Sequence, residues 1–128
     1  MRLAELRERV CTVNQGLVAA GLVVLAFGNA SGVDRGAGIL AIKPSGANYD
    51  TLRPTDIILV ALDDGRVIEG GGRPSSDSPT HLRLYRGFSS IGGIVHTHSI
   101  HAAAWHKLVG RFPVSVQPTQ TISTAQCP

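Results

Sequence analysis

Short apolar segments of two different periodicities alternate along this chain, and this mixture constrains its fold more than any other feature. The first segment has helical spacing, with charged residues on the faces between its apolar positions, which are Leu3, Leu6, Val10, Val13 and Leu17. Apolar residues at offsets of three and four are typical of an amphipathic helix that packs on a core. Gly21 follows as a suitable C-terminal cap, so we expect the helix to end there.

The next apolar segments are short enough to be strands. Residues 22–27 are an apolar run that we expect to be a buried strand, ending in the turn-rich residues 28–32. An Asp-Asp-Gly turn separates two further strand segments, which predicts a hairpin. The strands predicted after residue 32 cover residues 38–43, 57–62, 66–69 and 91–97.

Two more helices complete the pattern. The first has Ser78 as its candidate N-cap and Pro79 as its first helical residue. Its expected apolar face consists of Leu82, Tyr85 and Phe88, and an Ala-rich helix is predicted over residues 100–109. A chain of 128 residues that is 43% hydrophobic suits one packed domain. The order of elements predicts an α/β fold with helices covering a sheet.

The net charge of +3 does not by itself point to an anionic partner. All nine acidic residues lie at or before Asp77. The charged residues after it are all basic, namely Arg83, Arg86, Lys107 and Arg111. Aromatic residues make up only 5% and no Arg/Lys cluster occurs, so a nucleic-acid surface has no candidates. No apolar run reaches the length of a membrane span, and two cysteines do not make a disulfide framework. We expect a cytoplasmic protein without nucleic-acid or membrane partners.

His96-Thr97-His98 is the first candidate for chemistry. It ends an apolar strand segment, where residues two apart share a face and lie roughly 6.5–7 Å apart along the backbone. Two imidazoles so placed can chelate a metal ion such as zinc, although a catalytic site needs about three protein ligands. Ordinary hydrogen-bonded histidines would give the same pattern. Asp77 precedes a predicted helix and could cap it, ligate a metal or act as a base, whereas His81 suits a helix surface or an outer position better than a ligand.

Two loops have the composition of an oxyanion site. Lys43-Pro44-Ser45-Gly46 offers an ammonium group, a hydroxyl and a glycine whose backbone can approach a ligand closely. Ser75-Ser76 offers hydroxyls and N–H groups just before a helix, where phosphate binds readily. Neither loop has the spacing of a nucleotide-binding motif, and taken alone each could be only a tight turn.

Four motifs together resemble the class II aldolase/epimerase family. They are GNASGVDR (28–35), IKPSG (42–46), PSSDSPTH (74–81) and IGGIVHTHS (91–99), and they occur in the family's order. Asp77 favours the L-ribulose-5-phosphate 4-epimerase branch, because the aldolases have Glu there. The resemblance implies a three-layer α/β/α fold with a largely antiparallel sheet, and a homotetramer with sites at subunit interfaces.

The resemblance also assigns site residues. It implies a divalent metal ion, usually Zn²⁺, held by Asp77, His96 and His98. It implies a pentulose 5-phosphate substrate bound by Gly28, Asn29, Lys43, Ser45, Gly46, Ser75 and Ser76. The implied reaction converts L-ribulose 5-phosphate to D-xylulose 5-phosphate by carbon–carbon cleavage and re-addition.

Several of the family's functional residues have no counterpart in this sequence. There is no His after His106, no Asp or Glu after Asp77 and no Tyr after Tyr85, so the family's third histidine ligand and its catalytic Asp and Tyr are missing. We therefore expect residues 1–113 to be the N-terminal part of a class II aldolase/epimerase domain and residues 114–128 to be an irregular, diverged tail. The chain would be a truncated epimerase of doubtful independent activity. The alternative is a non-catalytic remnant that associates with a full-length paralogue.

Overall fold

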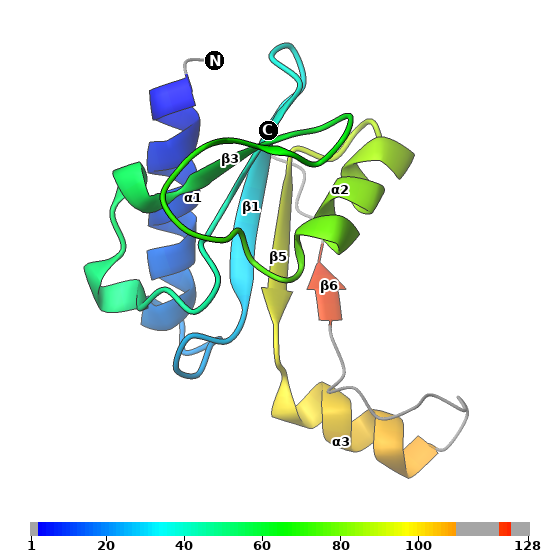
Figure 1. Ribbon diagram of the computed structural model, residues 1–128. Coiled ribbons are helices and arrows are strands. Elements are labelled where there is room, and N and C mark those ends of the chain that lie inside the picture. Colours follow the sequence, from blue (N-terminus) through cyan, green and yellow to red (C-terminus); the bar gives the residue numbers. More distant parts are fainter. Residues whose placement is uncertain (1–2, 110–120, 124–128) are drawn as a thin grey trace.

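An antiparallel sheet forms the centre of the molecule in the computed structural model, which describes residues 3–109 and 121–123 (Figure 1). The helices are α1 (Leu3–Ala19), α2 (Ser78–Gly87) and α3 (Ile100–Val109), with short 3-10 turns at Tyr49–Thr51 and Pro54–Asp56. The strands are β1 (Asn29–Asp34), β2 (Ile39–Ile42), β3 (Ile58–Ala61), β4 (Val67–Glu69), β5 (Gly93–Thr97) and β6 (Thr121–Ser123).

The described strands pair in the order β4-β3-β2-β1-β5-β6, and every neighbouring pair is antiparallel. β1 lies in the middle, with Ser31 opposite Ile42 of β2 on one side and opposite Ile94 of β5 on the other. Because of this register, β1 begins at the end of the sheet where β2 and β5 finish. The predicted hairpin is confirmed as β3 and β4.

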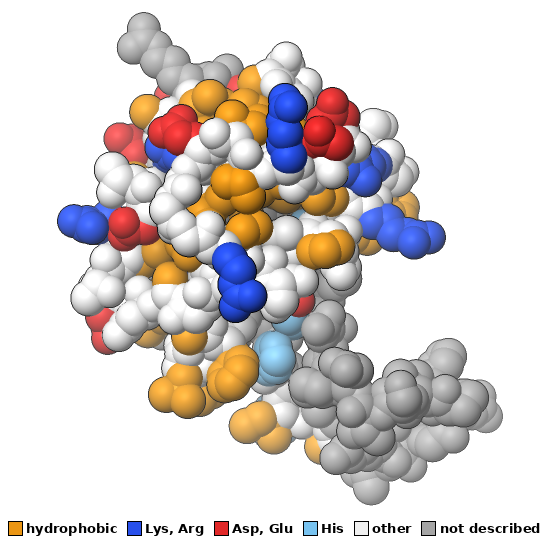
Figure 2. Space-filling model, viewed as in Figure 1, with side chains coloured by type: hydrophobic (Ala, Val, Ile, Leu, Met, Phe, Trp, Pro, Cys, Tyr) orange, Lys and Arg blue, Asp and Glu red, His pale blue; other side chains and the backbone are white. Residues whose placement is uncertain are grey.

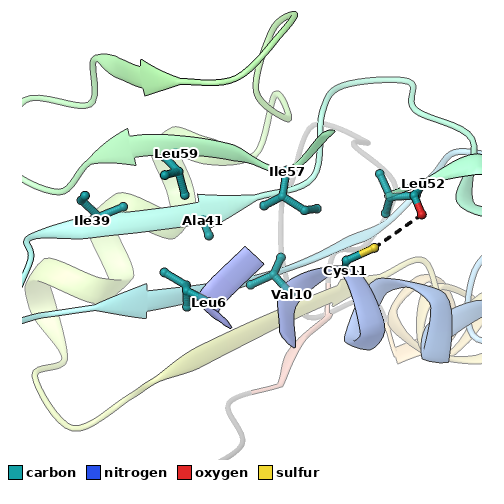
Figure 3. Packing of buried hydrophobic residues seen from close by; sticks show 8 residues of the cluster. All are labelled: Leu6, Val10, Cys11, Ile39, Ala41, Leu52, Ile57 and Leu59. Atoms are coloured by element: carbon teal, nitrogen blue, oxygen red, sulfur yellow. Dashed lines mark hydrogen bonds between the residues drawn. The ribbon is translucent and has the colours of Figure 1, made fainter. Parts of the chain in front are cut away.

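Each face of the sheet carries one helix. On one face α1 packs through Leu6, Val10 and Cys11, and the sheet contributes Ile39, Ala41 and Leu59 (Figure 3). On the other face α2 packs through Leu82 and Tyr85, and the alternate strand residues face it, including Leu40, Ile42, Ile58 and Val60. Burial of each such Leu, Ile or Val side chain stabilises the fold by roughly 1.5–3 kcal/mol. The predicted α/β fold is confirmed, with the sheet between helices.

The strand predicted at residues 22–27 is wrong. This segment is a loop with exposed side chains, among them Leu22 at 52%, Leu25 at 81% and Phe27 at 59% exposure. The strand begins instead at Asn29, within the residues predicted to be a turn. Its sequence, NASGVD, has little strand propensity, but pairing with β2 and β5 on both sides decides its conformation.

The remaining differences are smaller. α2 begins at Ser78, one residue earlier than predicted, and Phe88 is 58% exposed rather than part of its apolar face. The tail predicted to be irregular contains β6, while residues 114–120 and 124–128 lie outside the described part. None of the helices that the structure describes is long and apolar enough to cross a membrane.

Candidate functional site

A pocket of about 370 Å³ lies at the end of the sheet where β1 begins and where β2 and β5 end. All the residues predicted to bind metal or substrate line it: Gly28, Asn29, Lys43, Ser45, Gly46, Ser75, Ser76, Asp77, His96 and His98. Figure 2 shows histidine side chains at the surface of the molecule, next to hydrophobic ones. Four segments far apart in the sequence therefore meet at one cavity.

The two loops of oxyanion composition lie side by side. Pro44 and Pro74 form an antiparallel bridge, the Ser45 N–H donates to the Arg73 carbonyl (2.9 Å), and the Ser75 N–H donates to the Lys43 carbonyl (3.1 Å). These bonds place the Ser45-Gly46 turn beside the Ser75-Ser76 segment, directly before the N-terminus of α2. The dipole of a helix N-terminus favours an anion, and serine hydroxyls lie next to it here.

Asp77 occupies the N-cap position of α2, but its carboxylate makes no capping bond. Its Oδ2 instead accepts hydrogen bonds from His96 Nδ1 (2.8 Å) and Asn29 Nδ2 (2.7 Å). Burial raises the pKa of Asp77, but the hydrogen bonds from His96 and Asn29 outweigh it, so the pKa lies below its usual value. The carboxylate is thus ionised at neutral pH and faces the pocket.

His96 has one ring nitrogen held and the other unpaired. An ionised carboxylate can only accept, so Nδ1 carries a proton, and in the neutral ring Nε2 then has a lone pair. The residue is 3% exposed, and its Nε2 is buried without a hydrogen-bond partner among the described residues. The ring of His98 lies beside it, with centroids 4.8 Å apart, and Phe27 packs on His98 at 5.8 Å.

These donor atoms are of the kind that a divalent metal ion takes. A metal-ligating histidine usually donates its other N–H to a carboxylate, which is how Asp77 holds His96. The unpaired Nε2 of His96 and the imidazole of His98 are the type of nitrogen ligand that such an ion binds. Within residues 3–109 and 121–123, however, no group of three His, Cys, Asp or Glu is placed to hold a metal ion. The direct ligation by Asp77 that the resemblance implies stays a prediction.

Gly28 and Asn29 bring β1 close to the histidines. Gly28 has φ +81°, and a Cβ there would lie 2.8 Å from the His96 carbonyl oxygen, so only glycine fits. The Asn29 amide nitrogen also donates to Ser75 Oγ (3.1 Å), which ties β1 to the loop before α2. Its Oδ1 is buried without a partner and remains open to a donor.

Lys43 places a buried cation against the pocket. It is 2% exposed, with Nζ 4.6 Å above the ring of Tyr49 and near the carbonyls of Ala26 (3.4 Å) and Pro44 (3.5 Å). Burial lowers its pKa. No carboxylate of the described residues pairs with it, so an anionic group in the pocket would be a suitable partner.

His81 is a buried residue of α2, not a surface one. It is 1% exposed, does not line the pocket, and pairs through Nδ1 with Ser31 Oγ at 2.7 Å. Ser31 Oγ also pairs with the Tyr85 hydroxyl at 2.9 Å. Burial lowers the pKa of His81 to about 4, with the charge of Asp77 opposing the shift, so its ring is neutral at pH 7.

Comparison with known sequences identifies the family. The sequence model of the class II aldolase and adducin N-terminal domain matches residues 8–126. The chain belongs to this family. L-ribulose-5-phosphate 4-epimerase UlaF of Salmonella paratyphi C is 48% identical over 103 residues, which cover 80% of this chain and 45% of that protein.

Solved structures agree on the class II aldolase fold. An L-fuculose 1-phosphate aldolase superposes with a TM-score of 0.75 at 30% identity, covering 81% of this chain and 49% of that one. The L-fuculose-1-phosphate aldolase of Thermus thermophilus gives 0.64 at 29% identity, covering 80% and 50%. The chain thus spans about half the length of the relatives it matches. The family match also runs past residue 113, so the predicted domain boundary there stays untested.

Tyr49 contacts two residues that line this pocket, Gly28 and Lys43, and the sequence did not single it out. Its hydroxyl donates to the Gly28 carbonyl (2.7 Å), with the Phe27 carbonyl at 3.1 Å, and its ring faces Lys43. It therefore supports Gly28, which lines the pocket. No motif spacing marks it, because its partners lie 21 and 22 residues away along the chain.

Proposed function

We propose that this pocket binds a divalent metal ion together with a phosphorylated sugar, as part of an epimerase site of the L-ribulose-5-phosphate 4-epimerase type. The observation that carries the proposal is the meeting of ten predicted residues at one cavity, with the Asp77–His96 pair inside it. A likeness to UlaF at 48% identity supports the same reaction class. The proposed substrate is a pentulose 5-phosphate, converted between L-ribulose 5-phosphate and D-xylulose 5-phosphate.

His96 and His98 are the proposed metal ligands, with Asp77 holding His96 and available as a third. When bound, an ion such as Zn²⁺ supplies Lewis-acid stabilisation of the negative charge that develops on substrate oxygens. Asp77 keeps the His96 proton on Nδ1, which leaves the Nε2 lone pair for the ion. Asn29 donates to the same carboxylate oxygen and helps to fix it.

The phosphate group is proposed to lie between the two joined loops. Ser45, Gly46 and Ser76 offer polar groups at the pocket wall, beside the start of α2. Lys43 contributes a positive charge that no described carboxylate neutralises. The family's proton-transferring Asp and Tyr have no counterpart among these 128 residues, so binding is the property to test on this chain.

Calorimetric titration of the full chain with zinc chloride tests the metal site. We expect wild-type protein to bind zinc, and His96→Ala to weaken binding by at least tenfold, because it removes a ligand. His101→Ala is the matched control, since His101 is an exposed residue of α3 that does not line the pocket. Zinc binding that His96→Ala leaves unchanged, or no binding by the wild-type chain, would refute the metal site.

We also propose that the chain assembles into a homo-oligomer. Large apolar side chains are exposed on the loop before β1 and on α3, with Leu25 at 81%, Ile100 at 77% and Trp105 at 71%. Light scattering after gel filtration would show a mass above one chain. If the chain is monomeric alone but joins a full-length relative on mixing, the remnant hypothesis is favoured instead. The cytoplasmic location stays a prediction.

A further inference from the structure

We infer that Ser31, together with His81 and Tyr85, is a positioning cluster that sets the Asp77–His96 pair from outside the pocket. The inference rests on the proposed function of that pocket in one respect: ligand binding is the property that the cluster would affect. None of the three residues lines the cavity, so none can touch a ligand there. Their effect would reach the site through the placement of α2 on β1.

The spacing of two side chains on β1 matches the spacing of two side chains at the start of α2. Asn29 and Ser31 are two residues apart on β1, which spans about 6.6 Å and puts both side chains on the same face. Asp77 and His81 are four residues apart, which spans about 6 Å along the first turn of α2. Asn29 bonds to Asp77 at 2.7 Å and Ser31 pairs with His81 at 2.7 Å. The two contacts therefore hold β1 and α2 in one register.

The inner contact, between Ser31 and His81, is buried. Ser31 is 6% exposed, His81 1% and Tyr85 0%, among the apolar residues that α2 packs on. A buried polar group left without a partner is costly, so the three groups must keep their mutual hydrogen bonds. A shift of α2 along β1 would break them, whereas apolar packing alone would tolerate it.

The cluster is connected to the Asp77 carboxylate through the backbone of α2. The backbone N–H of His81 donates to the backbone carbonyl of Asp77 at 3.0 Å. Asp77 is therefore bonded to the helical turn that Ser31 holds. The outer contact, in contrast, is exposed to the pocket, since the Asp77 side chain is 19% accessible. The buried contact thus holds Asp77 where its Oδ2 meets His96.

Proton exchange at the His96 ring tests this inference without any metal. In the full chain we expect nitrogen-15 NMR to show the proton on Nδ1 of His96, protected from exchange by the bond to Asp77. Ser31→Ala should speed exchange of that proton by at least tenfold. Val33→Ala is the matched control, because Val33 is the next residue on the same face of β1, packs on the same core and makes no side-chain hydrogen bond.

The outcomes separate positioning from stability. The inference predicts that Val33→Ala lowers the thermal midpoint as much as Ser31→Ala but leaves the His96 proton protected. Equal exchange in Ser31→Ala and wild-type protein would overturn it, as would equal loss of protection in Val33→Ala, or an unprotected proton in wild-type protein. If Ser31→Ala does not fold, the test is made with Tyr85→Phe. We expect this variant to speed exchange of the His96 proton by a smaller factor, and unchanged exchange would contradict the inference.

A second readout is zinc affinity in the same variants. Loss of the hydrogen-bond partner of a ligating histidine typically weakens metal binding by 10–100-fold. Ser31→Ala would displace Asp77, the partner of His96, so we expect about tenfold weaker binding in this variant. Val33→Ala should stay within about twofold of wild type on the same principle. If wild-type protein binds no zinc at all, the proposed metal site fails, and the exchange measurement still decides the inference.

Discussion

The two faces of the sheet are built differently. The α1 face is mostly apolar, with Leu6, Val10 and Leu59 at its centre, but the buried Asn14 of α1 donates to the Ala30 carbonyl of β1 (3.0 Å) and accepts from the Ala30 N–H (2.9 Å). The α2 face mixes similar apolar residues with the buried polar groups of Ser31, His81 and Tyr85, and it runs directly into the pocket. Apolar packing suffices to hold a helix on a sheet, whereas hydrogen bonds set its position. We infer that hydrogen bonds help to position both helices, but that only the contacts of the α2 face set the geometry of the pocket.

The largest expected effect is on the α1 face. Leu59 is fully buried, so Leu59→Ala removes packing and leaves a cavity, at a cost of about 3–4 kcal/mol in the free energy of unfolding. Urea denaturation measures this change. Zinc affinity of the folded fraction should stay at the wild-type value. A folded Leu59→Ala protein with weakened zinc binding would break the division between the two faces.

A fall in pH should destabilise the α2 face. Burial lowers the pKa of His81 to about 4 from an ordinary 6.5, so the unfolded chain binds a proton in this range that the folded chain does not. Stability is therefore fully present above pH 6.5 and is lost as the pH falls toward 4, by about 3 kcal/mol in total. Urea denaturation at pH 7, 5.5 and 4.5 measures the slope. His81→Gln should flatten it; an equal slope in that variant would contradict the assignment to His81.

A third effect concerns the far end of α2. The Arg35 guanidinium donates to the carbonyls of Tyr85 (3.1 Å), Phe88 (2.8 Å) and Ile91 (2.9 Å). Arg35→Lys keeps the charge but cannot reach all three, so we expect a loss of about 1–2 kcal/mol in thermal or urea unfolding. Arg53→Lys, on the exposed turn before β3, is the control and should change little. Equal effects of the two substitutions would show that the Arg35 contacts do not anchor α2.

The smallest expected effect on stability belongs to Lys43. Removal of a buried cation relieves its desolvation, so Lys43→Met should leave the free energy of unfolding nearly unchanged. It should weaken calorimetric binding of L-ribulose 5-phosphate by about tenfold, because a hydrogen bond to a charged group is lost. Arg66→Met, at an exposed turn away from this pocket, is the matched control. Unchanged sugar-phosphate affinity in Lys43→Met would exclude Lys43 from the phosphate site.

The sequence predicts the elements whose local pattern agrees with their surroundings. α1, β2 and the β3–β4 hairpin follow from periodicity and turn residues. β1 does not, because Asn29, Ala30 and Gly32 have little intrinsic strand preference and the neighbouring strands determine their conformation. The apolar residues 22–27 predict a buried strand, but this segment pairs with no strand of the described sheet and most of its side chains are exposed.

The site shows the same limit. The resemblance named the residues that line the pocket, because the four motifs carry them in order. The hydrogen bonds among them join residues 48 and 19 positions apart, as in Asn29–Asp77 and His96–Asp77, and no local pattern encodes these. The burial of a helix residue depends on how the helix sits on the sheet, so the sequence leaves a helix surface and an outer position both open for His81.

The central claim is that a metal ion lies beside His96 on the α2 face. A crystal of the full chain soaked in zinc chloride, measured at the zinc absorption edge, tests it directly. The predicted result is an anomalous peak about 2.0–2.1 Å from His96 Nε2 and within bonding distance of His98. A peak only at other residues, or no peak in the pocket at saturating zinc, would contradict the claim.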